Sequence, residues 1–355
     1  MQPGARCGQS LRGRCLVLPV ECGHQPQPDH RRQCPAGRGC DRSGHGPGEC
    51  IAVTSEIECL ICGYRSVAPG AGELGACRGN TERFSAVSHH LWKCPRCASI
   101  HNIDPVDFAD LYRDYPLNQR RLDVFARGTL RNLLRRLEHA GLARDASILD
   151  YGCGNGVFID YLRQRGYADV HGYDPHVPAF ARRPEGQFDC VVANDVIEHV
   201  ADPRATIADF AALVRPGGLL YIGTADSEPV RMDDLEPHLM RLHQPFHRVI
   251  VTERSLHRLA AETGYAMVAH WRRSYMDTLL PFANYRFLDE FSRALGHILE
   301  RSFHPSASRV MFRRPRLWLY AFLGYFSPSA YEPAVLLRRS PVAVAGPEIT
   351  QESQQ

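Results

Sequence analysis

A glycine-rich turn in the middle of the chain has the spacing of a nucleoside-binding site. Residues 148–156 read Ile-Leu-Asp-Tyr-Gly-Cys-Gly-Asn-Gly, so an apolar run ends at Asp150 and opens into a Gly-x-Gly-x-Gly turn. Glycines allow a sharp turn and let a ligand approach more closely than a Cβ atom would permit. Dinucleotide sites use Gly-x-Gly-x-x-Gly instead. The spacing found here suits a nucleoside that carries an amino acid, with Asp150 facing its ammonium group and the turn facing its carboxylate.

Three further polar residues are placed to contact the same ligand. Asp174 closes the apolar run 170–174, where a carboxylate can accept hydrogen bonds from both hydroxyls of a ribose. Its alternative role is a simple helix cap before Pro175. Asn194 ends another apolar run, at residues 188–194, and Asp195 follows it. We therefore expect ligand contacts from these three residues and from Asp150, Tyr151, Gly152, Gly154, Asn155 and Gly156.

Four segments together resemble a known enzyme family. Residues 150–156, 172–174, 188–199 and 214–218 look like the successive motifs of class I S-adenosylmethionine-dependent methyltransferases, and they are most similar to the ubiquinone-biosynthesis O-methyltransferases. The resemblance covers residues 145–271. It implies a Rossmann-like, doubly wound and mostly parallel sheet that binds S-adenosylmethionine, with methyl transfer from its sulfonium to a nucleophile.

One segment departs from that family pattern. Only 13 residues lie between Asp174 and Phe188, where the family fits a full helix and a third strand. We expect this strand to be missing or vestigial. The acidic residue that contacts the adenine amino group in the family therefore has no counterpart that can be carried over.

Three histidines are candidates for a general base, which helps methyl transfer when the acceptor is a hydroxyl. His199 comes just beyond the run ending at Asn194, at the edge of the sheet where ligands bind. His243 and His247 lie in a long segment after residue 223, and long segments of this kind are often functional lids. Each of the three has a structural alternative as a packing or capping residue.

Two Cys-x-x-Cys pairs indicate a metal site. Cys59 and Cys62 are separated by 31 residues from Cys94 and Cys97, which matches a zinc ribbon in which four thiolates close a structural site. A redox dithiol would need one pair, and the Cys-x-x-x-Cys-x-x-Cys pattern of radical iron–sulfur enzymes is absent. Similar ribbons precede the catalytic domain in some sugar C-methyltransferases and some ribosomal-RNA methyltransferases, so the ribbon leaves the substrate open.

Alternating strands and helices are expected to position these residues. The apolar periodicity predicts strands at 147–151, 170–174, 188–194, 219–223 and 265–271, and helices at 107–139, 156–165, 202–214 and 252–263. This alternation predicts a parallel sheet covered on both faces. The expected parts are a leader at 1–52, the zinc module at 53–105, a linking helix at 106–140, the methyltransferase domain at 141–272, a helical extension at 273–340 and a disordered tail at 341–355.

The leader is rich in Gly, Pro, Arg and Cys and has no apolar period. We expect residues 1–52 to be disordered or not part of the native protein, and to be dispensable. Six of the chain's 13 cysteines lie in its first fifty residues, but no secretory signal precedes them. We therefore expect a cytoplasmic protein with reduced thiols.

Composition limits the choice of partner. A net charge of +3 on 355 residues argues against nucleic acid as the main partner, and no apolar stretch is long enough for a membrane span. The apolar segment 317–326 is expected to pack on the domain or across a homodimer, with peripheral contact to lipid as the alternative. The predicted function is methyl transfer to oxygen or carbon of a small molecule, such as a secondary metabolite, lipid precursor or sugar. An RNA-modifying methyltransferase and a non-catalytic binding module are the alternatives.

Overall fold

The computed structural model describes residues 16–17, 50–51, 56–70, 72–113, 115–328 and 332–341. The chain divides into two units, Met1–Glu56 and Ile57–Gln355. In the first unit, β1 (Leu16–Val17) pairs with β2 (Cys50–Ile51) in antiparallel fashion. The predictions for the rest of the leader and for the tail beyond residue 341 lie outside the described residues.

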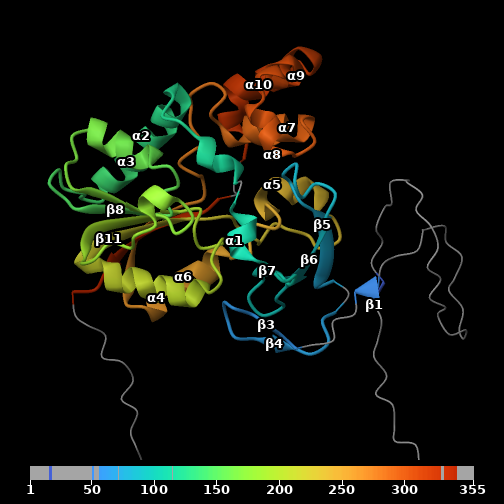
Figure 1. Cartoon of the computed structure of the whole chain (residues 1–355), viewed down its shortest axis with the longest axis horizontal. Helices are drawn as coiled ribbons and strands as arrows, with labels where there is room; N and C mark the ends of the chain where they lie inside the picture. The colour runs from blue at the N-terminus through green and yellow to red at the C-terminus, as the bar shows by residue number, and fades with distance from the viewer. Residues whose placement is uncertain are drawn as a thin grey trace, which may run out of the picture. The chain divides into compact units, whose positions relative to one another are not determined.

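A six-stranded sheet forms the centre of the second unit (Figure 1). Its order is β13-β14-β11-β10-β8-β9. The strands are β8 (Ile148–Tyr151), β9 (Val170–Tyr173), β10 (Phe188–Asn194), β11 (Val214–Gly223), β13 (Tyr265–Trp271) and β14 (Ala334–Arg339). Strands β9, β8, β10 and β11 are parallel, whereas β14 is antiparallel to both of its neighbours. The α/β fold predicted from the sequence is confirmed.

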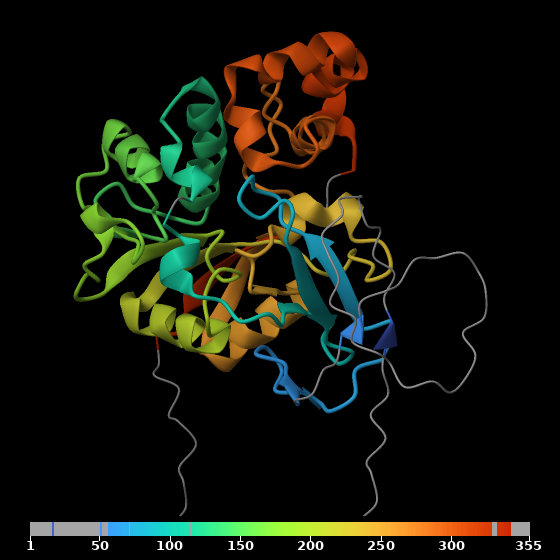
Figure 2. The ribbon, with the colours of Figure 1, turned by 45° about the vertical axis from the view of Figure 1, so that its right-hand side comes forward.

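Helices cover both faces of this sheet, as Figure 2 shows. On one face, α2 (Val124–His139) and α3 (Val157–Gln164) bury leucines against β8, β10 and β11. On the other face lie α4 (Pro203–Leu213) and α6 (Glu253–Glu262). Asp202 and Thr252 cap the first turns of α4 and α6 by accepting backbone N–H hydrogen bonds, which explains why these helices begin where the sequence predicted.

The segment 107–139 is not the single helix that the sequence predicted. It forms α1 (Phe108–Leu111), the 3-10 turn η1 (Pro116–Gln119) and then α2. Pro116 lacks the N–H that a continuing helix would need. Asp123 starts a new helix by accepting a hydrogen bond from the backbone N–H of Ala126. Because of this break, Tyr112 and Tyr115 lie near the carboxyl ends of the parallel strands.

The expectation of a missing third strand is confirmed in the described residues. Between β9 and β10 the chain forms only the 3-10 turn η2 (Pro178–Phe180). Strand β8 pairs directly with β9 on one side and with β10 on the other, so β9 is the last strand on its side of the sheet.

The C-terminal extension is helical only in part. It contains α7 (Tyr285–Ala294), α8 (Leu299–Phe303), η4 (Pro305–Ser308), α9 (Arg309–Arg313), α10 (Arg316–Leu323) and η5 (Gly324–Phe326). The sequence predicted a helical extension up to residue 340. This was wrong for Ala334–Arg339, which form strand β14 between β11 and β13. Val335, Leu336 and Leu337 are almost completely buried there. A run this short and apolar cannot be told from a buried helix by its period alone.

The cysteine-containing module has its own small sheet. Its strands are β3 (Ile57–Glu58) paired with β4 (Arg65–Ser66), and β5 (Leu74–Arg78), β6 (Ser88–Lys93) and β7 (Ile100–Asn102) in the order β12-β7-β6-β5. The fourth strand, β12 (Val249–Ile250), comes from the long segment after β11, which also carries η3 (Glu236–His238) and α5 (Leu239–Leu242). Module and segment share one core, built from Cys77, Leu91, Ile100, Ala225, Val230, Met232, Leu235, Leu239, Leu242 and Ile250.

The long segment after β11 is therefore a packed structural element. Lys93 Nζ donates hydrogen bonds to the carbonyl oxygens of Ser227 (3.2 Å) and Val230 (2.8 Å), and Ser227 Oγ donates one to the Ala98 carbonyl at 2.9 Å. These bonds fix the segment on the module. None of the helices in the described part of the chain has the length and apolarity needed to cross a bilayer.

Candidate functional site

A cavity of about 260 Å³ opens at the carboxyl ends of β8, β9 and β10. This is the edge at which open parallel sheets bind ligands. All but one of the predicted ligand contacts line it, namely Asp150, Tyr151, Gly152, Gly154, Asn155, Asp174, Asn194 and Asp195. Gly156 is the exception.

The three glycines of the turn have different roles. All have positive φ, at +77° for Gly152, +53° for Gly154 and +81° for Gly156, which side chains rarely adopt. A Cβ on Gly152 would lie 2.5 Å from Val196 Cγ2, and one on Gly156 would lie 2.9 Å from the Phe180 ring. A Cβ on Gly154 would meet no protein atom within 4 Å. Gly154 therefore faces open cavity, whereas the other two allow close packing.

Asp150 is a buried carboxylate at the floor of the cavity. Its residue is 7% exposed, and no hydrogen bond to its carboxylate is found among the described residues. Burial, and then the negative charge of Asp174, raise the pKa of Asp150 to about 8. A ligand cation beside it would lower that pKa and supply the missing partner. The arrangement therefore fits an ammonium group, as the sequence predicted.

Asp174 has hydrogen-bond partners within the protein and can accept further hydrogen bonds from a ligand. Its Oδ2 accepts a hydrogen bond from the Gly154 N–H at 3.0 Å, and its Oδ1 accepts one from the His176 N–H at 2.9 Å. The second bond is the capping role that the sequence left open. The first ties Asp174 to the glycine turn. Because each carboxylate oxygen can accept more than one hydrogen bond, the residue remains able to bind ribose hydroxyls.

A third carboxylate completes the acidic wall of the cavity. Asp195 has a φ of +54°, and its Oδ2 accepts a hydrogen bond from Asn194 Nδ2 at 2.7 Å. Desolvation in the cavity wall raises the pKa of Asp195 to about 6, although the positive charge of Arg120 opposes the shift. With Asp150 and Asp174, it gives the cavity an electrostatic preference for cations.

The predicted histidines form a cluster with two tyrosines at one side of the cavity. His199 lines the cavity, and the ring centroids of His247 and His243 lie 4.7 Å and 6.2 Å from its own. The Tyr112 hydroxyl lies 2.7 Å from His199 Nδ1, and the Tyr115 hydroxyl lies 3.1 Å from His243 Nε2. His243 and His247 themselves do not line the cavity and stand behind His199 and Tyr115.

Burial makes all three histidines neutral at physiological pH. Burial and the neighbouring histidines hold the pKa of His199 well below its usual value, and burial does the same for His243. Burial lowers the pKa of His247 to about 4. The Tyr112 hydroxyl also stays protonated, because burial raises its pKa far above the usual range.

Among the cavity residues that were not anticipated from the sequence, five carry a hydroxyl, guanidinium or imidazole group, namely Tyr112, Tyr115, Arg120, His176 and Tyr275. The His176 ring stacks on the Tyr112 ring at a centroid distance of 4.1 Å. The tyrosines were hidden because segment 107–139 was assigned to one helix. Pro116, which disfavours a continuous helix, was the feature of the sequence that could have revealed the break.

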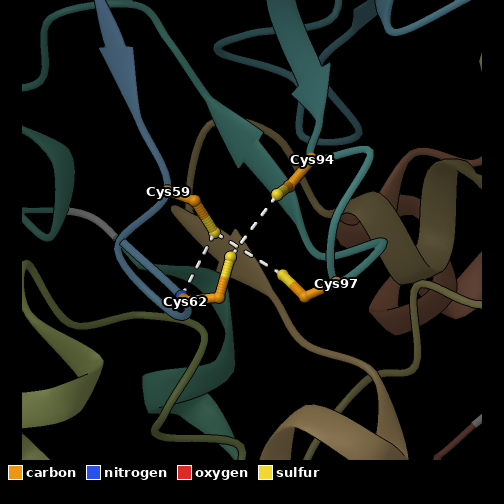
Figure 3. Close-up of side chains that lie close together, drawn as sticks. All are labelled: Cys59, Cys62, Cys94 and Cys97. Carbon is orange, nitrogen blue, oxygen red and sulfur yellow. Dashed lines mark hydrogen bonds between the residues drawn. The ribbon is translucent and has the colours of Figure 1, made fainter. Parts of the chain in front are cut away.

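The four predicted metal ligands come together in the module (Figure 3). Their sulfur atoms lie within 4.8 Å of one another, with Cys59 and Cys97 Sγ atoms 3.5 Å apart and Cys62 and Cys94 Sγ atoms 3.7 Å apart. Tetrahedral zinc with Zn–S bonds of about 2.3 Å places sulfurs about 3.8 Å apart. The donor set therefore fits zinc.

Neighbouring groups support this cluster. His101 Nε2 lies 3.2 Å from Cys59 Sγ, a position from which an imidazole N–H can donate to a thiolate. The carbonyl of Cys97 accepts hydrogen bonds from the hydroxyls of Thr252 (3.3 Å) and Ser255 (3.4 Å) at the start of α6. The cysteine cluster is thus fastened to the α/β domain.

Comparison with known proteins finds similarity over the α/β domain. Residues 119–270 match a family described as "Methyltransferase domain". Over this segment the chain is similar to methyltransferase domains. The match includes the glycine turn, all three cavity aspartates and the three histidines. It leaves out the four cysteines and helices α7 to α10.

Curated relatives of the methyltransferase domain include two ubiquinone biosynthesis O-methyltransferases. The one from Pseudomonas paraeruginosa is 34% identical over 171 residues, covering 41% of this chain and 62% of the relative. The one from Psychrobacter cryohalolentis is 29% identical over 175 residues, covering 42% of this chain and 63% of the relative. The chain thus spans less than two thirds of the length of these relatives. The resemblance recognised in the sequence is confirmed.

A solved structure also overlaps the methyltransferase domain and part of its surroundings. It is a 1,6-didemethyltoxoflavin-N1-methyltransferase from Burkholderia thailandensis with bound S-adenosylhomocysteine. The two chains are 16% identical with a TM-score of 0.39, and the overlap covers 71% of this chain and 96% of the other. An overlap this loose transfers no residue role.

Proposed function

We propose that this chain is an S-adenosylmethionine-dependent methyltransferase that methylates oxygen or carbon of a small molecule. The observation that carries the proposal is the buried Asp150 carboxylate, which faces the cavity beneath an open glycine turn and beside Asp174. Burying a carboxylate without a hydrogen-bond or ionic partner costs free energy, and a bound ammonium group would offset this cost. Asp150 would hold the methionine ammonium, Gly154 would leave room for its carboxylate, and Asp174 would hold the ribose. Bound S-adenosylmethionine would supply an electrophilic methyl group.

Tyr112 and His199 would handle the proton of a hydroxyl acceptor. When the ring proton of neutral His199 is on Nε2, Nδ1 can accept a hydrogen bond from the Tyr112 O–H, 2.7 Å away. Tyr112 lines the cavity, and its oxygen would accept a proton from the acceptor hydroxyl. As it does so, the proton of Tyr112 passes to His199 Nδ1. This relay needs no ionised tyrosine, which matches the raised pKa of Tyr112.

His243 and His247 would be positioning residues in this mechanism. His243 Nδ1 is bonded to Asn80 Oδ1 at 2.7 Å, and His247 Nδ1 is bonded to the Arg241 carbonyl at 2.7 Å. Both rings are thereby fixed against His199. The sequence offered them as general bases, and their place behind the cavity wall favours a supporting role.

A small-molecule acceptor is favoured over RNA by the surroundings of Lys93. It is the only lysine of the chain, and it lies on the cysteine module that would grip a nucleic acid. Its ammonium group already donates hydrogen bonds to the backbone carbonyls of Ser227 and Val230, in the segment after β11. Phosphate binding needs basic side chains that are free to reach the backbone of the nucleic acid.

The cysteine cluster would hold one structural zinc ion. Cys59, Cys62, Cys94 and Cys97 provide all four ligands of a closed tetrahedral site, so no coordination position would remain for catalysis. Its role would be to hold β3–β4 and β6–β7 together beneath the segment that carries His243 and His247.

Formation of S-adenosylhomocysteine in the presence of an acceptor tests the proposed activity. The acceptor can be sought among metabolites of a deletion strain that are lighter by one methyl group. Purified protein should methylate such a fraction, and the Tyr112→Phe protein should do so much more slowly. Binding of S-adenosylmethionine with no turnover on any fraction would favour the non-catalytic alternative.

A further inference from the structure

The C-terminal helices carry a concentration of exposed apolar side chains. Fifteen large apolar side chains are exposed in the residues that the structure describes, and seven of them lie within residues 303–326. Soluble surfaces usually scatter such side chains singly, and a gathering of them marks an interaction site. The seven are Phe303, Phe312, Trp318, Leu319, Phe322, Leu323 and Phe326.

Helix α10 shows that internal packing does not account for this surface. Only Leu317 and Ala321 of α10 are buried, and they pack against Phe287 of α7 and Met311 of α9. Its other face presents four exposed side chains, Trp318, Leu319, Phe322 and Leu323. The sequence favoured packing of this segment on the domain or across a dimer. The structure shows packing on one narrow side and an uncovered apolar face on the other.

Arginine is the only charged residue type in this stretch of sequence, and the nearest acidic side chains, Glu82 and Glu300, lie beside Phe303 and Arg309. Residues 301–331 contain five arginines and no Asp or Glu. Arg309, Arg313, Arg314 and Arg316 are exposed, and their side chains have no acidic partner among the described residues. The neighbouring helix α7 differs, because Arg286 pairs with Glu290 at 2.8 Å and Arg293 with Asp289 at 3.3 Å. We call the seven apolar side chains and these four arginines the arginine–aromatic face.

Aromatic contacts connect this face to the wall of the cavity. The Phe282 ring lies edge-on to Trp318 and Phe322, with centroid distances of 5.9 Å and 5.8 Å. On its other side it contacts Phe125 at the start of α2, at 6.4 Å. Ala126, the next residue, lines the cavity. Figure 2 shows the C-terminal helices beside α2 in this arrangement.

We propose that the arginine–aromatic face docks on a bilayer surface that contains anionic lipids. Aromatic and leucine side chains enter the boundary between headgroups and acyl chains, while arginines bind anionic headgroups. A second copy of the chain is a poorer occupant. It would bring this set of unpaired arginines against an identical set, and like charges repel. This inference concerns attachment and does not depend on the proposed chemistry.

Vesicle flotation with the full chain tests the proposal. The protein should float with vesicles of phosphatidylcholine containing about a third phosphatidylglycerol, and it should stay at the bottom with pure phosphatidylcholine. Arg313→Ala with Arg314→Ala should lower the partition coefficient about 30-fold, since each arginine contributes about fivefold. Trp318→Asp with Phe322→Asp should abolish flotation.

Matched controls separate the face from general effects of charge and apolarity. Arg254→Ala with Arg258→Ala removes two arginines from α6, and Val67→Asp changes an exposed apolar side chain of the cysteine module. Both should float like the unaltered protein, and all variants should keep its melting temperature. Equal flotation of the Trp318/Phe322 variant would overturn the proposal. So would a dimer, seen by light scattering, that the same variant dissociates while no form floats.

Discussion

The hydroxyl of Tyr112 and the Nδ1 atom of His199 lie 2.7 Å apart, and both residues line the same cavity. They come from segments 87 positions apart in the chain. The pair links the break after α1 to the carboxyl end of β10. In the proposed mechanism it would provide a route for a proton to leave the cavity.

Tyr112→Phe should slow methyl transfer while leaving the cofactor site intact. The variant removes the oxygen that would accept the proton, so kcat should fall about 100-fold, the usual scale of acid–base assistance. Affinity for S-adenosylhomocysteine should stay within about twofold. Tyr167→Phe is the control, because its hydroxyl bonds to Glu138, remote from the cavity lining. An unchanged kcat for Tyr112→Phe with a verified acceptor would contradict the relay.

Asp150 should make both stability and binding depend on pH. Its folded-state pKa of about 8 lies above the ordinary value of 3.8, so the folded protein keeps a proton that the unfolded chain releases. The stability of the ligand-free protein should therefore fall as pH rises from about 4 to about 8. Asp150→Asn should remove this fall and raise the melting temperature at pH 8. Affinity for S-adenosylmethionine should rise over the same range, since the ammonium needs the ionised carboxylate.

The exposed Asp145→Asn is the control for this experiment. It should leave the pH dependence of melting and of binding unchanged. If Asp150→Asn melts with the same pH dependence as the unaltered protein, the placement of a neutral buried acid at this position is wrong.

Asp174→Ala should weaken binding of S-adenosylmethionine by about 1.5–3 kcal/mol, the contribution of hydrogen bonds to a charged group. The structure adds a second cause, because the Gly154 N–H loses its acceptor. Asp174→Asn keeps one carbonyl acceptor and should lose less. Isothermal titration can rank the three proteins. Equal affinities would show that Asp174 caps the backbone at His176 and does nothing for the ligand.

The chain should contain one zinc ion, and Cys94→Ser should lower the metal content well below one equivalent. Because the module shares its core with residues 225–250, metal loss should also lower the melting temperature by about 10 °C or more. Cys77→Ala alters a buried cysteine outside the cluster and should keep its zinc. Undiminished zinc in Cys94→Ser would remove this cysteine from the ligand set.

The sequence predicted what local pattern determines. Strands β10 and β13 have the predicted bounds, and α4 begins one residue after its predicted start at residue 202. The cluster of Cys59, Cys62, Cys94 and Cys97, and the cavity position of eight of the nine predicted ligand contacts, also followed from motifs in the sequence. Pairings between distant segments were not predictable in this way. Strand β14 pairs with β11 although its first residue lies 111 positions after the last residue of β11. Strand β12 pairs with β7, which ends 147 positions earlier in the chain.

The charge of the arginine–aromatic face also could not be predicted from the composition of the chain. The whole chain is nearly neutral, which argued against an anionic partner. The stretch 301–331 contains five arginines and no acidic residue, and six of its aromatic and leucine side chains between residues 312 and 326 are exposed. An average over the chain conceals a local excess, because ion pairs such as Arg286–Glu290 cancel charge elsewhere.

A crystal structure grown with saturating S-adenosylhomocysteine tests the central claim most directly. The account predicts density for one molecule in the cavity, with its ammonium group beside Asp150, its carboxylate near Gly154 and its ribose hydroxyls on Asp174. The ring of His199 and the hydroxyl of Tyr112 should face the sulfur side of that molecule. Density for the ligand at another place on the chain, or an empty cavity at saturation, would contradict it.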